Sequence, residues 1–275
     1  MPGRIACLYR HPVKGFTPER LDSAVLEARA WFPGDRLYAV ENGASGFDPA
    51  APRHIGKTKF TVLANCPSLA RARTRYDDAS GWLTVELNHE EPFTCDLATE
   101  AGRADFAAWL TGFLDPEDVR GPLRVLSTAG AHRFTDSAKG FVSLINLESV
   151  RDLERRLGRP IDPLRFRANL YVEGWPAWSE LAARPGSILK LGRAEAEVVQ
   201  PIVRCVATHV DPKTGERDLE IVQALHRLYG HLSCGLYLNT SWGGRVSAGD
   251  PAELAAAPPL APAPSDDYVR AVPLA

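Results

Sequence analysis

The stretch of this sequence best suited to chemistry is built around one thiol. Cys205 follows Arg204 at the end of a β-rich segment, and an Asp-Pro-Lys-Thr-Gly turn occupies residues 211–215. A neighbouring guanidinium favours the thiolate form of a cysteine, which is both a nucleophile and a soft metal ligand. A cysteine is also a small apolar side chain suited to a protein core. Reactive thiol and buried packing residue are therefore the two readings of Cys205 that its local sequence leaves open.

Zinc is the first alternative use of this thiol. Thiol and imidazole groups, the usual ligands of tetrahedral zinc, recur over a short part of the chain. They are Cys205, His209, His226, His231 and Cys234. Their spacing fits no compact zinc-finger pattern. A zinc-dependent or thiol-dependent hydrolase that uses Cys205 with His209 is therefore kept as an alternative function.

Other short motifs point to no further chemistry. Residues 54–58 read His-Ile-Gly-Lys-Thr and resemble the end of a phosphate-binding loop, but Ala51 stands where that loop needs a glycine. No Gly-x-Gly-x-x-Gly follows an expected strand, and no four cysteines lie close together. A built-in nicotinamide or flavin domain and an iron–sulfur centre are not expected.

Composition indicates an ordinary soluble globular protein. The 275 residues are 45% apolar and 24% charged, and the formal net charge is -2. This balance gives no reason to expect nucleic acid as a partner, and no apolar run reaches the roughly 18 residues of a membrane span. The amino-terminal residues show no signal-peptide pattern, and the five cysteines have no repeated spacing. We therefore expect a cytoplasmic protein with reduced thiols and no membrane association.

The elements that must position these groups are mostly strands in the first half. Short β-branched or aromatic runs bounded by turn signals predict strands at residues 5–9, 24–30, 36–41, 60–63 and 82–87. A helical pattern follows at residues 98–114. Strands of this spacing favour a barrel or a sandwich, and we place a domain boundary near residue 120.

The second half alternates strands with two helices. One helix is predicted to start at the cap residue Asn146 and end at Gly158; the other is predicted to be capped by Asp218 and to end at Gly230. Residues 233–246 resemble a hairpin, and the chain is rich in Ala and Pro from Pro251 onward, which predicts a loose tail. Further strands are expected at residues 140–145, 168–172, 188–191, 195–206 and 235–239. The expected fold is α+β and predominantly β.

A set of short motifs in a fixed order carries a resemblance to one family. The stretch at residues 201–215 is similar to the MOSC domain, which takes its name from the C-terminal domain of molybdenum cofactor sulfurases. Residues 11–15 and 33–38 resemble the β-barrel domain that precedes MOSC in the amidoxime-reducing enzymes and their bacterial relatives. Residues 141–146, 165–170 and 249–251 also fit, so the resemblance covers about residues 4 to 252. It implies an N-terminal MOSC-associated β-barrel domain at 1–120, a MOSC β-barrel domain with a few helices at 121–253, and an Ala/Pro-rich tail at 254–275.

The resemblance also implies a site for a molybdenum–molybdopterin cofactor. The equivalent of Cys205 in this family ligates molybdenum. Basic side chains would make charge-assisted hydrogen bonds to the cofactor, with Lys14 and Arg36 facing its phosphate. Arg167 and Asn169 would reach the pterin, with Ser143 nearby, in a cleft between the two domains. The implied cofactor-binding residues are Lys14, Arg36, Ser143, Arg167, Asn169 and Arg204, and the implied catalytic residue and metal ligand is Cys205.

The implied activity is reduction of N-hydroxylated compounds, namely hydroxylamines, amidoximes or N-hydroxylated bases. Because the sequence has no flavin, iron–sulfur or nicotinamide motif, the electrons are expected from a separate ferredoxin-, flavin- or cytochrome-type protein. The second alternative function is a carrier that uses the same thiol and catalyses no reaction. In it, Cys205 carries a persulfide or the chain only stores the cofactor.

Overall fold

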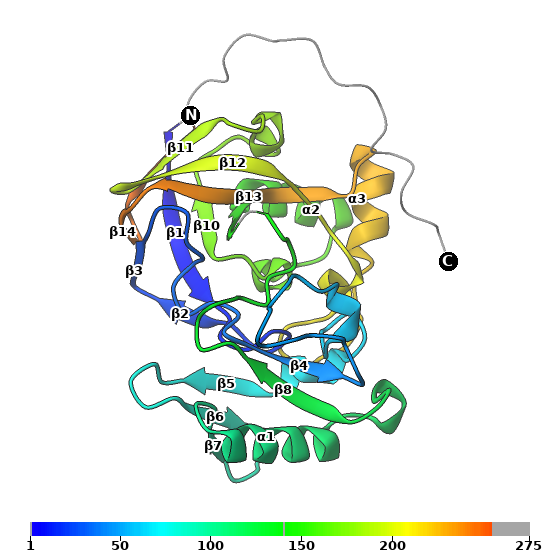
Figure 1. Ribbon diagram of the computed structural model, residues 1–275. Coiled ribbons are helices and arrows are strands. Elements are labelled where there is room, and N and C mark those ends of the chain that lie inside the picture. Colours follow the sequence, from blue (N-terminus) through cyan, green and yellow to red (C-terminus); the bar gives the residue numbers. More distant parts are fainter. Residues whose placement is uncertain (1, 140, 255–275) are drawn as a thin grey trace.

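Seven strands form a closed barrel that includes the first strand of the chain. The computed structural model describes residues 2–139 and 141–254. Around the barrel the order is β10, β9, β13, β12, β11, β15 and β1, and β1 pairs again with β10 (Figure 1). The bounds are β1 (Pro2–Arg10), β9 (Val142–Asn146), β10 (Leu170–Glu173), β11 (Ile188–Leu191), β12 (Ala194–Val203), β13 (Ser233–Trp242) and β15 (Pro251–Leu254).

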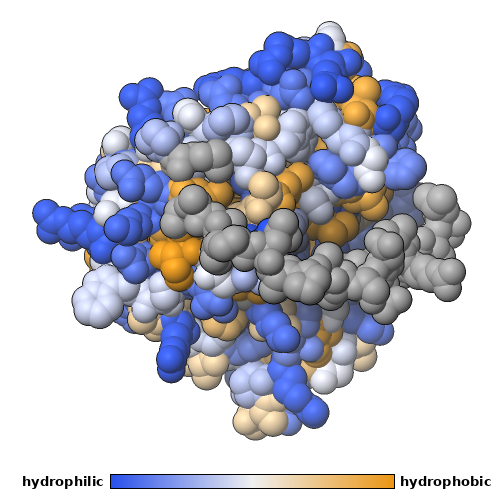
Figure 2. Space-filling model, turned by 90° about the horizontal axis from the view of Figure 1, so that it is seen from above, coloured by the Kyte–Doolittle hydropathy of each residue, from blue (hydrophilic) through white to orange (hydrophobic). Residues whose placement is uncertain are grey.

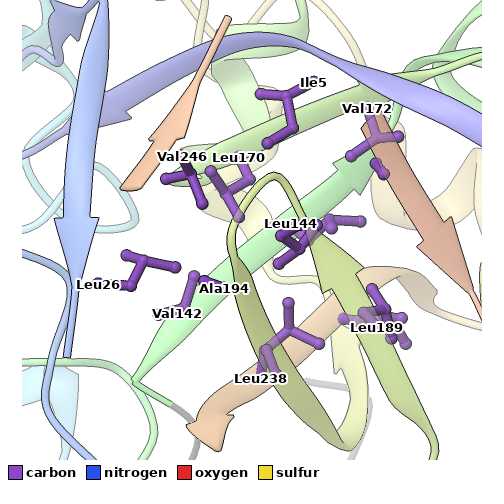
Figure 3. Packing of buried hydrophobic residues seen from close by; sticks show 14 of the residues in the cluster. Ile5, Leu26, Val142, Leu144, Leu170, Val172, Leu189, Ala194, Leu238 and Val246 are labelled. Carbon is purple, nitrogen blue, oxygen red and sulfur yellow. The ribbon is translucent and has the colours of Figure 1, made fainter. Parts of the chain in front are cut away.

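Alternating side chains fill the barrel. Ala194, Ala196, Val198 and Ile202 of β12 are buried, whereas Gln200 is exposed where the register with β13 shifts. Figure 3 shows Ile5, Leu144 and Leu238 from three different strands pointing toward one another inside the barrel. The face seen from above is accordingly hydrophilic over much of its area, with hydrophobic patches between (Figure 2). This alternation is what a closed barrel with an apolar interior requires.

Strands from the start of the chain pair with strands from its second half. β1 pairs with β10 and β15, β2 (Glu19–Leu21) pairs with β1, and β3 (Ser23–Leu26) pairs with β14 (Gly244–Ser247). The domain boundary near residue 120 stays a prediction, but the barrel is built from both sides of it.

The rest of the first half forms a layer below the barrel (Figure 1). β4 (Tyr38–Asn42) pairs with β8 (Leu123–Ser127). β5 (Arg73–Tyr76), β6 (Trp82–Glu86) and β7 (Phe93–Asp96) form a three-stranded sheet. Helix α1 (Glu100–Phe113) begins at Thr99, whose hydroxyl accepts from the Gly102 amide. α1 belongs to the same apolar core as this sheet through Phe106 and Leu110, which anchors the layer.

Two helices flank the barrel. α2 (Leu147–Leu157) begins after Asn146, whose side chain accepts from the Glu148 amide at 3.1 Å, and ends at Gly158 in a left-handed conformation. α3 (Ile221–Tyr229) ends at Gly230 in the same way. The prediction that Asp218 caps this helix is wrong, because α3 begins at Ile221 and Asp218 instead forms an ion pair with Arg165 at 2.7 Å. The short 3₁₀ helices are η1 (Lys57–Lys59), η2 (Pro67–Arg71), η3 (Pro116–Asp118), η4 (Pro163–Phe166), η5 (Ser179–Ala182) and η6 (Val206–His209).

Three predictions about strands need correction. The hairpin at residues 233–246 does not form, because β9 and β12 already occupy the two edges of β13, and β14 pairs with β3. Residues 60–63 make only an isolated bridge through Phe60. The Ala/Pro-rich stretch is not loose from Pro251, because β15 completes the barrel; the predicted tail at 254–275 otherwise lies outside the described residues.

The fold class itself is confirmed. The part of the chain that the structure describes is mostly β, with three α-helices and a closed barrel. Within that part, no helix has the length and apolar character needed to cross a membrane.

Candidate functional site

Cys205 lies between the end of β12 and the start of η6, where the chain leaves the barrel, and its side chain lines a pocket. The residue precedes η6 in an extended conformation and lines two adjoining cavities. The larger has a volume of about 680 Å³, counting its open mouth. Residues of both halves of the chain line these cavities, including Lys14 and Arg36 from the first and Ser143, Arg167 and Asn169 from the second. All seven residues singled out in the sequence therefore meet at one site.

The cation at the thiol comes from a distant segment. The ammonium group of Lys57 in η1 donates to Sγ of Cys205 at 3.1 Å. Burial opposes the charge of Lys57, but Asp136 and Cys205 outweigh it and raise the pKa of this lysine. Lys57 lines both cavities, and the sequence analysis passed over it as part of an accidental phosphate-loop match.

Arg204, the sequence neighbour of the thiol, faces backbone carbonyls. Its guanidinium donates to the carbonyls of Cys234 and Phe166, the latter at 2.9 Å, and lies over the Phe166 ring. The side chain thus joins β13 to η4 beside the pocket. Its predicted contact with a cofactor stays a prediction.

Lys14 is buried and already paired. Its side chain is 3% exposed and its ammonium donates to the Phe134 carbonyl at 2.9 Å and to the Asp136 carboxylate. Burial lowers the pKa of Lys14 despite Asp136. Gly15 follows with φ of +92°, and a Cβ there would lie 2.5 Å from the Thr61 carbonyl. Only glycine fits this close approach beside Lys14.

Arg36 lines both cavities and is held by its neighbours. Its guanidinium donates to Asp35 at 2.5 Å and to the Arg167 carbonyl at 3.1 Å, and lies 3.1 Å from Nδ1 of His11. Burial opposes ionisation of Asp35, but Arg36 outweighs it and keeps the pKa of that carboxyl below its usual range. Burial and the nearby arginines lower the pKa of His11 to about 3, so His11 is neutral.

Arg167 differs from the other cations because its guanidinium has no hydrogen bond or ion pair among the described residues. The residue caps η4 in a left-handed conformation, which turns the backbone at the pocket. Burial, followed by the charge of Arg36, lowers its pKa to about 10. Arg167 therefore stays protonated at neutral pH; Asp35 and Asp136 act on its charge from a distance, but neither forms an ion pair with it.

The Ser143–Asn169 pair forms the uncharged side of the pocket. The Asn169 carboxamide oxygen accepts from the Ser143 amide at 3.0 Å and from its hydroxyl at 2.8 Å. The Ser143 hydroxyl also accepts from the Asn169 amide at 3.1 Å, and the Asn169 side chain donates to the Tyr9 carbonyl at 3.2 Å. These bonds join β9, β1 and the start of β10.

We call Lys14, Arg36, Lys57 and Arg167 the cationic cluster. Two carboxylates, Asp35 and Asp136, line the same cavities, so the cluster carries two positive charges in excess. Asp136 is the central anion: its side chain is 44% exposed, and although burial opposes ionisation, Lys14 and Lys57 lower its pKa. The local sequence marks neither Asp136 nor Lys57 as a site residue, because only long-range packing brings them to the cavities that Cys205 lines.

The proposed zinc ligands do not converge. Nε2 of His209 accepts from the Val222 amide at 3.2 Å, and Nδ1 of His231 accepts from the Ser233 amide at 3.3 Å. Among the residues whose placement is described, no group of three or more His, Cys, Asp or Glu side chains is arranged to hold a metal ion. The zinc alternative therefore has no ligand set here and is not carried further.

Comparison with solved structures gives weak likenesses. YuaD from Bacillus subtilis superposes with a TM-score of 0.44 at 13% identity, covering 92% of this chain and 94% of that one. YiiM from Geobacillus stearothermophilus gives a TM-score of 0.34 at 26% identity, covering 42% of this chain and 55% of that one. At such scores the superpositions support no argument about the site.

Sequence comparison gives clearer relatives. This chain is similar to proteins named molybdenum cofactor sulfurase from Caenorhabditis briggsae, at 35% identity over 142 residues, and from Caenorhabditis elegans, at 34% over 154 residues. The matches cover 48% and 53% of this chain but only 18% and 19% of those proteins. The chain thus spans less than a fifth of the length of these relatives.

Family models account for most of the chain. Residues 2–116 match the MOSC N-terminal beta barrel domain, and residues 131–253 match the MOSC domain. The order of the two domains is the one that the sequence motifs indicate. With both domains present in sequence, and with Cys205 of the second at a pocket lined by Lys14 of the first, the chain belongs to the MOSC-domain family.

Proposed function

We propose that this protein is a molybdenum cofactor-dependent reductase of N-hydroxylated compounds. The observation that carries the proposal is Arg167, a guanidinium without a partner among the described residues, in the pocket that Cys205 lines. An unpaired charge that is largely removed from water is costly, so a pocket of this kind favours an anionic ligand.

The residues present fit the cofactor. The cationic cluster has two positive charges in excess of Asp35 and Asp136, and a phosphate monoester carries nearly two negative charges at neutral pH. Lys14 and Arg36 would hold that phosphate by charge-assisted hydrogen bonds. Asn169 and Ser143 offer amide and hydroxyl groups for a polar ring, and the Cys205 sulfur is a soft ligand suited to molybdenum.

The cofactor, when bound, would supply the two-electron redox chemistry at the N–O bond. The chain's own residues would hold it and shape access to it. Val203 and Val206, which flank the Arg204–Cys205 pair, are 56% and 43% exposed and offer apolar contact to an organic substrate. Burial raises the pKa of Tyr237, so its hydroxyl stays protonated at the pocket lining. Electrons would come from a separate carrier protein of ferredoxin, flavin or cytochrome type.

The test is to purify the protein from a host that makes the cofactor, measure its molybdenum, and assay reduction of a hydroxylamine with an artificial electron donor. One molybdenum per chain and amine formation are expected. Cys205→Ser should lose both, while the exposed Lys59→Met serves as a control that keeps both. Absence of molybdenum from the wild-type protein would overturn the proposal.

A second candidate is favoured by the names of the relatives, which are molybdenum cofactor sulfurases. In this role the chain would carry the cofactor, or a persulfide on Cys205, without turning over a substrate. Treatment with cyanide separates the two: a metal-free protein that releases one thiocyanate per chain supports the carrier. Stoichiometric molybdenum with turnover and no cyanolysable sulfur supports the reductase.

A further inference from the structure

The pocket contains one contact that the binding of a phosphate and a pterin does not explain. Lys14, Arg36 and Arg167 are cations without any contact to the thiol, whereas the Lys57 ammonium donates directly to Sγ of Cys205 at 3.1 Å. This contact joins η1 to the end of β12, across 148 residues of sequence. An ammonium group 3.1 Å from a sulfur is within the range of an N–H···S hydrogen bond.

The contact is held in place from both sides. The backbone amide of Lys59 donates to the Gly56 carbonyl, which closes the turn of η1, and Arg120 donates to the Thr58 carbonyl. On the sulfur side, the Cys205 carbonyl accepts from the amide and the hydroxyl of Thr208. Lys57 and Cys205 therefore project from fixed turns, and the sequence neighbour Arg204 is engaged with the Cys234 and Phe166 carbonyls.

We propose that Lys57 is a positioning residue that tunes the sulfur ligand of the cofactor through this hydrogen bond. The inference rests on the proposed function. A hydrogen bond to a metal-ligating thiolate withdraws electron density from the sulfur, which stabilises the more electron-rich state of the centre and raises its reduction potential. Lys57 would thus set how easily the centre accepts electrons from its carrier, whereas Lys14 would act on affinity alone.

The experiment compares three variants of the cofactor-loaded protein by redox titration with electron paramagnetic resonance of the Mo(V) state. Lys57→Met should shift the Mo(V) spectrum and move the midpoint potential to a more negative value, and Lys57→Arg, which keeps a donor, should restore most of both. Lys14→Met should lower the molybdenum content but leave the spectrum and potential of the bound fraction unchanged. Because both readouts report only on bound metal, a partial loss of occupancy in Lys57→Met does not obscure them.

The outcomes separate the inference from the function on which it rests. If wild-type protein binds molybdenum and Lys57→Met has its spectrum and potential, Lys57 does not tune the sulfur and the inference is wrong. If wild-type protein binds no molybdenum, the proposed function fails and the inference falls with it. Circular dichroism of each variant confirms that the barrel is folded, and where Lys57→Met is unstable, Lys57→Leu removes the donor in its place.

Discussion

The cationic cluster and the Ser143–Asn169 pair line two adjoining cavities, but their polar groups are satisfied differently. Ser143 and Asn169 bond to each other and to the Tyr9 carbonyl, so they need no ligand. The cluster has more positive charge than Asp35 and Asp136 neutralise, and Arg167 lacks a partner within the described residues. The Ser143–Asn169 pair therefore contributes mainly to the stability of the fold, whereas the cationic cluster is suited to binding an anionic ligand.

The most disruptive test of this contrast removes Lys14. Lys14→Met takes away a charge-assisted hydrogen bond worth about 1.5–3 kcal/mol and leaves Asp136 facing the anion site. Binding of inorganic phosphate to the cofactor-free protein should weaken roughly tenfold to a hundredfold by isothermal titration calorimetry. Lys59→Met, which removes an exposed lysine of η1, is the control. Equal phosphate affinity in wild type and Lys14→Met would place the anion elsewhere.

The uncharged side should respond in stability instead. Asn169→Ala leaves the buried Ser143 amide without its acceptor, which costs about 1–3 kcal/mol of unfolding free energy. Urea denaturation should show this loss, while phosphate affinity should change by less than about twofold because no charge is removed. The exposed Asn88→Ala is the matched control. A large loss of phosphate affinity in Asn169→Ala would erase the distinction between the two groups.

A substitution of Arg167 should have the opposite effect to Asn169→Ala, because it should weaken phosphate binding without lowering stability. Arg167→Met removes a guanidinium that has no partner in the described structure, so we expect unchanged or slightly higher stability and roughly tenfold weaker phosphate binding. Arg204→Met should instead destabilise the protein, because the Cys234 and Phe166 carbonyls lose their donor. Thermal unfolding and calorimetry of the two variants measure both effects. Comparable destabilisation in the two would mean that Arg167 also supports the fold.

The smallest effect is expected at Asp136. Asp136→Asn removes the carboxylate at the centre of the cluster, and phosphate should bind up to about fivefold tighter, the size of a partly exposed ion pair. Because Lys14 and Lys57 lower the pKa of Asp136, its carboxylate is charged above the ordinary aspartate value of about 3.9 and is neutralised only as pH falls below it. Because phosphate itself gains a negative charge within the range from pH 5 to 8, the pH series uses sulfate, and the affinity ratio between variant and wild type should be constant over that range. A ratio that changes in this range would assign the effect to another group.

The features that could be predicted from the sequence are those that depend on a few neighbouring residues. The helix cap at Asn146 and the terminating glycines 158 and 230 follow from short-range rules, and the structure confirms them. Motif order was enough to select a set of site residues that the structure brings to one pocket.

The predictions that were wrong concern features that depend on contacts between distant parts of the sequence. The hairpin after β13 looked correct locally, but both edges of β13 were already occupied. The cation beside Cys205 was expected from its neighbour Arg204, whereas tertiary packing supplies Lys57. A lysine in an isolated Gly-Lys-Thr sequence carries no local sign of that contact, so only coordinates or a comparison across relatives could reveal it.

The place of β1 in the barrel has a consequence for how the protein is made. β1 pairs with β15, so Arg4 lies opposite Pro251, and the same strand leads directly to Lys14. On the ribosome the barrel cannot close until residue 254 has left the exit tunnel, long after the segment with Lys14 was synthesised. Such distant pairing makes folding slow and leaves strand edges exposed in the meantime. A ligand can therefore be captured at the complete pocket only after β15 has emerged and closed the barrel.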